Sequence, residues 1–380
     1  MSVSSIANPD LAILADNKAR WNTPAHRRTG FQSLHRINRY GISLRSDEVL
    51  VQSEAFDPRI GELGAVKALT STGIFCGMIV VRGQDVLFEK YADDFGPDQP
   101  HTIMSISKTV MNLIIGELVA DDKINLAASV SDYLPKIGSG YASATIQQVL
   151  NMDLENNYTE DYTDPFASSY LHEAVIGWRL PGEGMPQHQT QKEFLANIRS
   201  DDIANRTGAA NYKSANTDVL AWLAEEVSGQ PMRAWLTDIV EAAGLEQALY
   251  MSTDREGFPV VDGGGCLTAR DLARLGLLFA RRGKGVCGRK VGNAQFIDFT
   301  REVPGPKMPP PIDFFHYSNQ TMTDGTWIGH GGYGGQFMLA NLDTGVVGVF
   351  FSVLENADAF DRDYTASIVR MLADIARDFG

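Results

Sequence analysis

Two side chains in the first third of the chain could carry nucleophilic chemistry. Ser105 and Lys108 stand three positions apart at the start of an apolar segment with helical spacing, so they would share one face of a helix. Burial favours the neutral amine of the lysine, and a neutral amine can take the proton of a serine hydroxyl. Chance alone gives on the order of one Ser-x-x-Lys tetrad in such a chain, so a solvated lysine is the alternative.

Tyr212 could complete a proton relay with these two residues. It lies in the segment Asn211–Asn216, directly before a predicted helix, where its phenol can point into a cleft. A phenol near an ammonium group is a competent proton relay. Ser214, two residues further on, is a candidate for contact with the substrate. The alternative is a helix-capping loop in which the tyrosine is only packed.

A glycine-rich segment on a late strand could bind a developing oxyanion. His330, Gly331 and Gly332 are followed by Tyr333, and glycines in a strand let a substrate or another backbone approach closely. The strand edge can then present an N–H group, and the start of the helix at Ser105 offers a second. The alternative is a glycine-rich bulge. The segment also matches G-x-G-x-x-G, but a predicted strand follows it, so we reject a dinucleotide-binding loop.

These residues lie in a chain whose two ends are predicted to form strands and whose middle is predicted to be helical. A hairpin is indicated at 73–92, and further strands at 326–330, 336–343 and 346–353. Helical patterns occupy 105–124, 145–152, 214–229, 232–244, 268–283 and 361–379. This order predicts an α+β fold: an antiparallel sheet built from both chain ends, flanked by helices, with a mostly α-helical insertion.

The predicted elements divide the chain into two regions that are not sequential. Residues 1–103 and 264–380 would form the region with the antiparallel sheet, and residues 104–263 the mostly helical region that carries Ser-x-x-Lys and Tyr-x-Ser. The active site would lie in the cleft between them. The polar and aromatic stretch 155–188 has little periodicity, which is typical of loops that carry binding residues.

An arginine-rich segment without acidic residues precedes the first predicted strand. Its charge density is below that of a nucleic-acid-binding arm, so we expect these guanidinium groups to pair with acids of the main body. An anion-binding patch is the alternative. The arginines are Arg20, Arg27, Arg28, Arg36, Arg39 and Arg45.

Composition and charge argue against several classes of protein. The formal net charge of −14 disfavours a nucleic-acid partner, and no apolar run approaches the roughly 20 residues of a membrane helix. Three widely spaced cysteines and seven histidines without ligand spacing predict neither a disulfide framework nor a metal site. We expect no cofactor, a small-molecule substrate and, since no secretory signal is visible, a cytoplasmic protein. A homodimer is left open.

The order of the three motifs resembles the serine β-lactamase and penicillin-binding-protein superfamily, in particular its class C-like members. The resemblance covers about 73–351, and 261–276 also looks like a segment common in those members. Within the superfamily, 161–165 and 212–222, together with Trp21, look most like the branch of 6-aminohexanoate-dimer (nylon-oligomer) hydrolases and their esterase relatives.

This resemblance implies roles for the candidate residues. Ser105 would be the nucleophile, Lys108 the base and Tyr212 the proton relay. The backbone N–H groups of Ser105 and Tyr333 would form the oxyanion hole.

The resemblance also implies how the substrate binds. Tyr162 matches a tyrosine that contacts the substrate amide, and Glu173 falls where the branch has an acid that can meet an ammonium group. Asp262 departs from an expected asparagine and alters the charge near the pocket. The His-Gly-Gly form at 330–332 is closer to the broader superfamily than to the branch, so both departures bear on the substrate more than on the mechanism.

We therefore expect a serine hydrolase that acts through an acyl-enzyme on small linear amides or esters, with similarity to the 6-aminohexanoate-dimer hydrolases. One alternative keeps the fold and makes the protein a carboxylesterase or a β-lactamase-like enzyme. The other is a non-catalytic binding protein on the same scaffold. Acidic residues at 173 and 262 hint at a substrate that carries a cationic amine.

Overall fold

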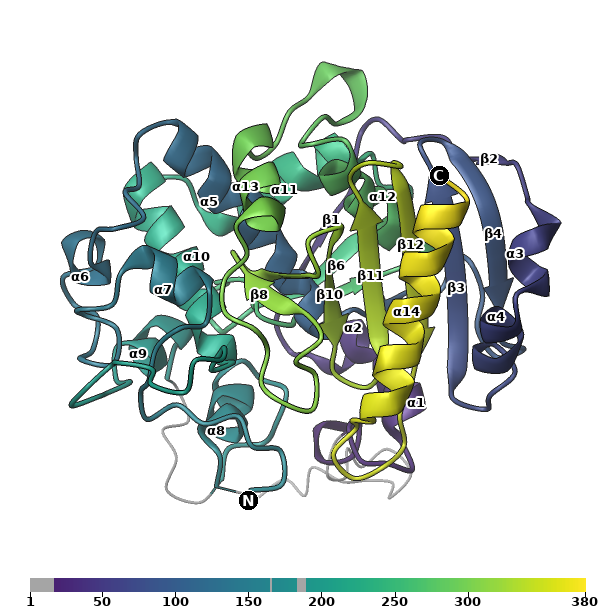
Figure 1. The fold of residues 1–380 in the computed structure, drawn as a ribbon. Helices are drawn as coiled ribbons and strands as arrows, with labels where there is room; N and C mark the ends of the chain where they lie inside the picture. Colours follow the sequence, from purple (N-terminus) through teal and green to yellow (C-terminus); the bar gives the residue numbers. More distant parts are fainter. Residues whose placement is uncertain (1–16, 165, 183–188) are drawn as a thin grey trace, which may run out of the picture.

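An eight-stranded sheet organises the structure (Figure 1). The computed structural model describes residues 17–164, 166–182 and 189–380. Neighbouring strands are antiparallel except for the parallel pair β2 and β4, which confirms the predicted sheet from both chain ends and the α+β class. In spatial order the strands are β2 (Ser53–Glu54), β4 (Asp85–Tyr91), β3 (Phe75–Arg82), β12 (Val346–Ser352), β11 (Gln336–Asn341), β10 (Trp327–Gly332), β9 (Thr321–Thr323) and β8 (His316–Ser318).

Helices cover both faces of this sheet (Figure 1). On β12, the side chain of Val347 lies against Gly276 of α12 (Ala269–Ala280), and the next residue, Gly348, faces α14 (Arg362–Asp378). Successive strand residues point to opposite faces, so the two helices enclose the sheet. Burial on both sides explains why β11 and β12 are apolar along most of their length instead of alternating.

A second, four-stranded sheet was not predicted. Its order is β1 (Gly41–Leu44), β6 (Leu249–Ser252), β7 (Gly265–Leu267) and β5 (His101–Thr102). Strands this short leave no readable periodicity in the sequence. Strand β6 falls within the region predicted to be mostly helical, whereas β5 leads directly into the turn that carries Ser105.

Helix α10 (Ser214–Ser228) forms the centre of the helical part. Every residue from Ser214 to Ala224 is buried, and the helix packs against α5 (Val110–Ala120) and ends at Gly229, whose φ of 68° suits a glycine. The helices predicted at 145–152, 214–229, 232–244 and 268–283 are confirmed, but the one predicted at 105–124 begins as a 3-10 turn. The division into two regions stays a prediction.

The remaining helices are η2 (Asn17–Ala19), α1 (Arg27–Phe31), α2 (Leu34–Ile37), α3 (Pro58–Glu62), α4 (Gly64–Leu69), η3 (Met104–Thr109), α6 (Val130–Tyr133), α7 (Ile146–Leu150), α8 (Ser168–Val175), α9 (Gln191–Leu195), α11 (Met232–Ala243), η4 (Val286–Gly288) and α13 (Ala294–Glu302).

The arginine-rich segment anchors the N-terminal part of the chain. Arg28 pairs with Asp94 at 2.5 Å, as expected. For Arg27 the expectation is wrong: this buried guanidinium donates hydrogen bonds to the backbone carbonyls of Leu354 and Asn356 instead of pairing with an acid. These bonds tie the N-terminal segment to the loop after β12.

Two further sequence predictions can be compared with the structure. Within residues 17–164, 166–182 and 189–380, no helix is long and apolar enough to cross a membrane. Cys76, Cys266 and Cys287 are all free thiols, so the structure contains no disulfide framework among them. The start of the chain, where a secretory signal was sought, lies outside the described residues, and the cytoplasmic location stays a prediction.

Replacing Arg27 with Ala is expected to lower the free energy of unfolding by about 3 kcal/mol, because charged hydrogen bonds to buried carbonyls are lost. Urea denaturation measures the change. Arg28→Ala is the matched control: its guanidinium also donates to backbone carbonyls, those of Gly73 and Phe75, and pairs with Asp94, but it is more exposed, so a smaller loss is expected. Equal losses in the two variants would contradict the anchoring role of Arg27.

Candidate active site

Ser105 and Lys108 lie on the 3-10 turn η3, between strand β5 and helix α5. The preceding residue is strained, since Met104 has a φ of 47°, a left-handed conformation that costs a non-glycine residue roughly 1–2 kcal/mol. Ser105 is partly exposed and lines a pocket, whereas Lys108 is fully buried. Backbone strain of this kind clusters at functional sites.

The amine of Lys108 has three hydrogen-bond partners. Its Nζ lies 3.1 Å from the Ser105 hydroxyl, 3.0 Å from the Ser214 hydroxyl and 2.5 Å from the backbone carbonyl of Asp262. The carbonyl can only accept, and the Ser214 hydroxyl already donates to Glu160. A neutral amine therefore spends its two N–H groups on these partners and keeps its lone pair for the proton of Ser105.

Burial moves Lys108 toward the neutral form. Desolvation lowers the pKa of its amine from the usual 10.5, while the charges of Asp262, Glu160 and Asp218 act in the opposite direction. Desolvation is the largest of these effects, so the amine loses its proton more easily than an exposed lysine does. A group with this pKa and this contact suits a general base.

Tyr212 lies beside both residues, at the entry to α10. Its ring centroid is 5.1 Å from Lys108 Nζ, and its hydroxyl has hydrogen-bonding neighbours in Ser105 and Ser214. Burial raises the pKa of Tyr212 well above 10, so its hydroxyl keeps its proton at neutral pH. Ser105, Lys108 and Tyr212, which the sequence singled out in two distant segments, thus meet in one place.

Glu160 is a residue of this site that the sequence analysis missed. Its carboxylate accepts the Ser214 backbone N–H at 2.7 Å, the Ser214 hydroxyl at 2.8 Å and the Tyr162 hydroxyl at 2.6 Å. It therefore fixes two predicted site residues relative to each other. The only signal in the sequence was its place two residues before Tyr162, in a stretch without periodicity.

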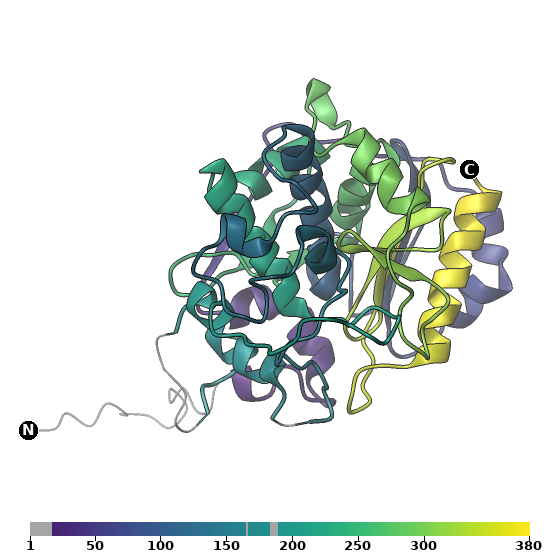
Figure 2. The same cartoon turned by 60° about the vertical axis from the view of Figure 1, so that its left-hand side comes forward.

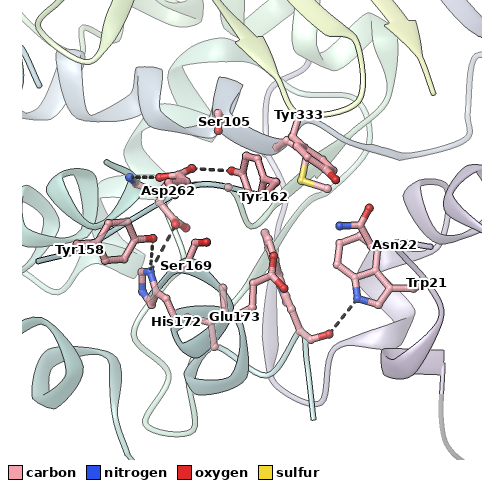
Figure 3. A pocket seen from close by; sticks show the side chains of 16 residues that line it. Trp21, Asn22, Ser105, Tyr158, Tyr162, Ser169, His172, Glu173, Asp262 and Tyr333 are labelled. Carbon is pink, nitrogen blue, oxygen red and sulfur yellow. Dashed lines mark hydrogen bonds and ion pairs between the residues drawn. The ribbon is translucent and has the colours of Figure 1, made fainter. Parts of the chain in front are cut away.

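A pocket opens onto Ser105 (Figure 3). Part of its wall comes from the N-terminal segment, where the indole N–H of Trp21 donates to the Trp178 carbonyl at 2.9 Å. The lining residues are Trp21, Asn22, Met104, Ser105, Tyr158, Glu160, Tyr162, Ser169, His172, Glu173, Ile176, Trp178, Ser214, Asp262, Gly263 and Tyr333.

Two predicted residues support the site from behind and do not line the pocket. His330 is buried on β10 against the ring of Tyr212, with a centroid distance of 6.2 Å, and burial lowers its pKa to about 3, so it is neutral. A side chain at Gly332 would come within 2.6 Å of the Ile103 carbonyl. Glycine at this position therefore lets β10 pass close to the turn that carries Ser105.

Glu173 lines the pocket as predicted but already has a partner. Its carboxylate pairs with the guanidinium of Arg179 at 3.0 Å, and the arginine is 47% exposed. Burial raises the pKa of Glu173, while Arg179 opposes that rise. An ammonium group of a substrate would have to share or displace this arginine.

A buried polar cluster lies beside Lys108, made of His172, Asp218 and Asp262. Among the described residues these three bring one possible metal-ligating atom each within 4.8 Å of one another. Burial lowers the pKa of His172 to about 4 and raises that of Asp262 to about 6. The three residues are far apart in the sequence, so spacing could not reveal the cluster, and the absence of a metal site stays a prediction.

The chain matches known proteins over most of its length. The family model described as Beta-lactamase matches residues 72–370. The chain is 34% identical over 278 residues to the 6-aminohexanoate-dimer hydrolase of Paenarthrobacter ureafaciens, which covers 71% of this chain and 69% of that protein.

Solved structures share the fold. A Bacillus anthracis protein, provisionally described as a 6-aminohexanoate-dimer hydrolase, has a TM-score of 0.79 at 18% identity, over 95% of this chain and 96% of that one. A family VIII carboxylesterase has a TM-score of 0.59 at 14% identity, over 85% and 99% of the two chains.

The chain therefore belongs to the β-lactamase family, and the predicted membership of this superfamily is confirmed. Over most of its length it is similar to the 6-aminohexanoate-dimer hydrolase named above.

The pH dependence of the reaction tests the charges around Lys108. A lysine that acts as a base does so as the free amine, so kcat/KM is expected to fall when the pH drops through the pKa of Lys108. The Asp262 carboxylate raises that pKa, so Asp262→Asn is expected to move the acidic limb of kcat/KM to lower pH, by about one unit. The pH profile for a p-nitrophenyl ester measures the shift.

Glu173→Gln is the control for this experiment, because Glu173 is not among the charges that act on Lys108. Its acidic limb is expected to stay in place even where KM changes. A limb that moves to higher pH in Asp262→Asn, or that moves equally in both variants, would contradict the account.

Proposed function

We propose that the protein hydrolyses small linear amides or esters through an acyl-enzyme, with Ser105 as nucleophile, Lys108 as base and Tyr212 as proton relay. One observation carries the proposal: Lys108 Nζ lies 3.1 Å from the Ser105 hydroxyl, and its two other partners are acceptors. Nucleophile and base are thus within hydrogen-bond reach, and the base is oriented by third groups.

In acylation, Lys108 takes the hydroxyl proton of Ser105, and the serine oxygen bonds to the carbonyl carbon of the substrate. The backbone N–H groups of Ser105 and Tyr333 are suited to bind the resulting oxyanion. Tyr212 donates its proton to the leaving amine or alcohol and regains one from the ammonium of Lys108. The carbon–nitrogen or carbon–oxygen bond breaks, and the acyl group stays on Ser105.

Deacylation uses the same groups in reverse. As a water molecule attacks the ester carbonyl, it gives a proton to Tyr212, which passes its own proton to the neutral amine of Lys108. The bond between Ser105 and the acyl carbon breaks, and the serine oxygen takes back a proton. The free acid leaves, and Lys108 returns to its neutral form.

The substrate class is supported by the pocket and by the relative. A 34% identical protein is named for hydrolysis of a linear amide dimer, and the negative charge of Glu173 at the pocket wall suits an ammonium group at the end of such a chain. Tyr162 would contact the amide from the same wall. A carboxylesterase activity is the second candidate, because Glu173 already forms an ion pair with Arg179. An ester without an ammonium group would not need this carboxylate.

Labelling with a fluorophosphonate is expected to add one adduct to the wild type at Ser105 and none to Ser105→Ala. Hydrolysis of every substrate should fall by about a thousandfold or more in that variant. Intact-mass and peptide mass spectrometry locate the adduct. Ser107→Ala, in the same turn, is the matched control and should still be labelled. Wild type without an adduct would favour a binding protein.

Glu173→Gln is expected to reduce kcat/KM about tenfold or more for an amide substrate with a terminal ammonium group, and to leave an uncharged ester of equal length within twofold. Arg179→Gln should have the opposite effect, since it frees the carboxylate for the substrate. Steady-state kinetics with the two substrates measures the difference. Equal losses for both substrates would show that Glu173 does not meet an ammonium group.

A further inference from the structure

Asp218 is linked to Lys108 through the backbone of Asp262, although it does not line the pocket. It lies one turn after Ser214 on α10 and is completely buried. Its Oδ1 accepts the backbone N–H of Asp262 at 3.2 Å. The carbonyl of that same residue, Asp262, accepts the hydrogen bond from Lys108 Nζ at 2.5 Å.

The Asp262 backbone needs such an anchor because the chain beside it is intrinsically flexible. Asp262 is followed by Gly263, Gly264 and Gly265, and glycine has more backbone freedom than any other residue. Small residues are required here: a Cβ at Gly264 would come within 2.7 Å of the Val260 carbonyl, and one at Gly265 within 2.8 Å of the Ser107 hydroxyl. Close packing therefore demands glycines here. The Gly264 N–H closes the turn by donating to the Val260 carbonyl at 2.7 Å, and Asp218 adds a second anchor at the residue whose carbonyl holds Lys108.

His172 lies on the other side of the Asp218 carboxyl group, without a hydrogen bond to it. Its Nε2 lies 3.5 Å from Asp218 Oδ2, and its ring is stacked on Phe194 with a centroid distance of 4.8 Å. Figure 3 shows His172 with Tyr158 and Asp262 at one end of the pocket, away from Trp21.

We propose that Asp218 is a positioning residue for the reaction: it anchors the backbone N–H of Asp262, which limits how the carbonyl of that residue, in the next peptide group, can turn away from the Lys108 amine whose lone pair is directed at Ser105. The inference rests on the proposed function. If the carbonyl turned away, Lys108 would lose one of its two orienting acceptors, and its lone pair would no longer be restricted to Ser105. Misplacement of a reacting group by about 1 Å can cost about a hundredfold in rate.

Three variants at one position test this role. Asp218→Asn keeps an oxygen that can accept the Asp262 N–H, Asp218→Leu keeps similar volume without an acceptor, and Asp218→Ala removes both. The rate of Ser105 acylation by a fluorophosphonate, the kcat and KM for a p-nitrophenyl ester, and the thermal midpoint are measured for each. Leu and Ala are both included so that one apolar variant remains to be measured if the other does not fold.

Acylation and kcat are expected to fall about a hundredfold in Asp218→Leu and Asp218→Ala with KM within about twofold, and to stay within about fivefold of wild type in Asp218→Asn. Asp271 provides the matched control: it is a fully buried carboxylate that accepts backbone N–H groups, far from the pocket. Asp271→Ala should lower the thermal midpoint while the folded protein keeps its acylation rate.

Two results would overturn the inference. Asp218→Leu or Asp218→Ala that acylates as fast as Asp218→Asn would show that no acceptor is needed at this position. Loss of rate in Asp218→Asn equal to that in Asp218→Leu would show that charge, not the hydrogen bond, is what matters. Wild type without an adduct at Ser105 is a separate outcome, because it means that the proposed function itself fails.

Discussion

The buried amine of Lys108 is the constraint on which the site depends. Its three hydrogen-bond partners come from the η3 turn, the start of α10 and the glycine-rich loop before β7. Removing a lysine from water without partners is costly, so the site is stable only when all three segments are in place. The same burial lowers the pKa of the amine, so the packing that forms the site also prepares the base.

Much of the architecture serves to bring these segments close together. Gly332 lets β10 pack closely against the η3 turn, and Gly265 lets β7 do the same. Met104 adopts a strained left-handed conformation just before Ser105, and the surrounding structure must hold it there. The N-terminal segment, anchored through Arg27, adds Trp21 to the pocket wall, although it lies outside the matched family region.

The sequence alone predicted the features that short local patterns encode. Ser105, Lys108 and Tyr212 stand in short motifs at helix starts, and the long strands and helices have clear periodicity. The motif residues and the long elements were therefore predicted correctly in position. Glu160, Asp218 and His172 matter only through contacts across the fold, which no spacing encodes. His330 was placed on the correct strand, but side-chain burial behind Tyr212 could not be foreseen. The second sheet was missed because its strands have two to four residues.

The central claim is that Lys108 is an amine of lowered pKa whose lone pair faces Ser105. The most direct measurement is an NMR titration of the Lys108 side chain, with ¹³C-labelled lysine and Lys108→Met to assign its signal. The account predicts a pKa clearly below the usual 10.5. A pKa at or above 10.5 would contradict it, because the group would then be a stable ammonium ion that could not act as the base for Ser105.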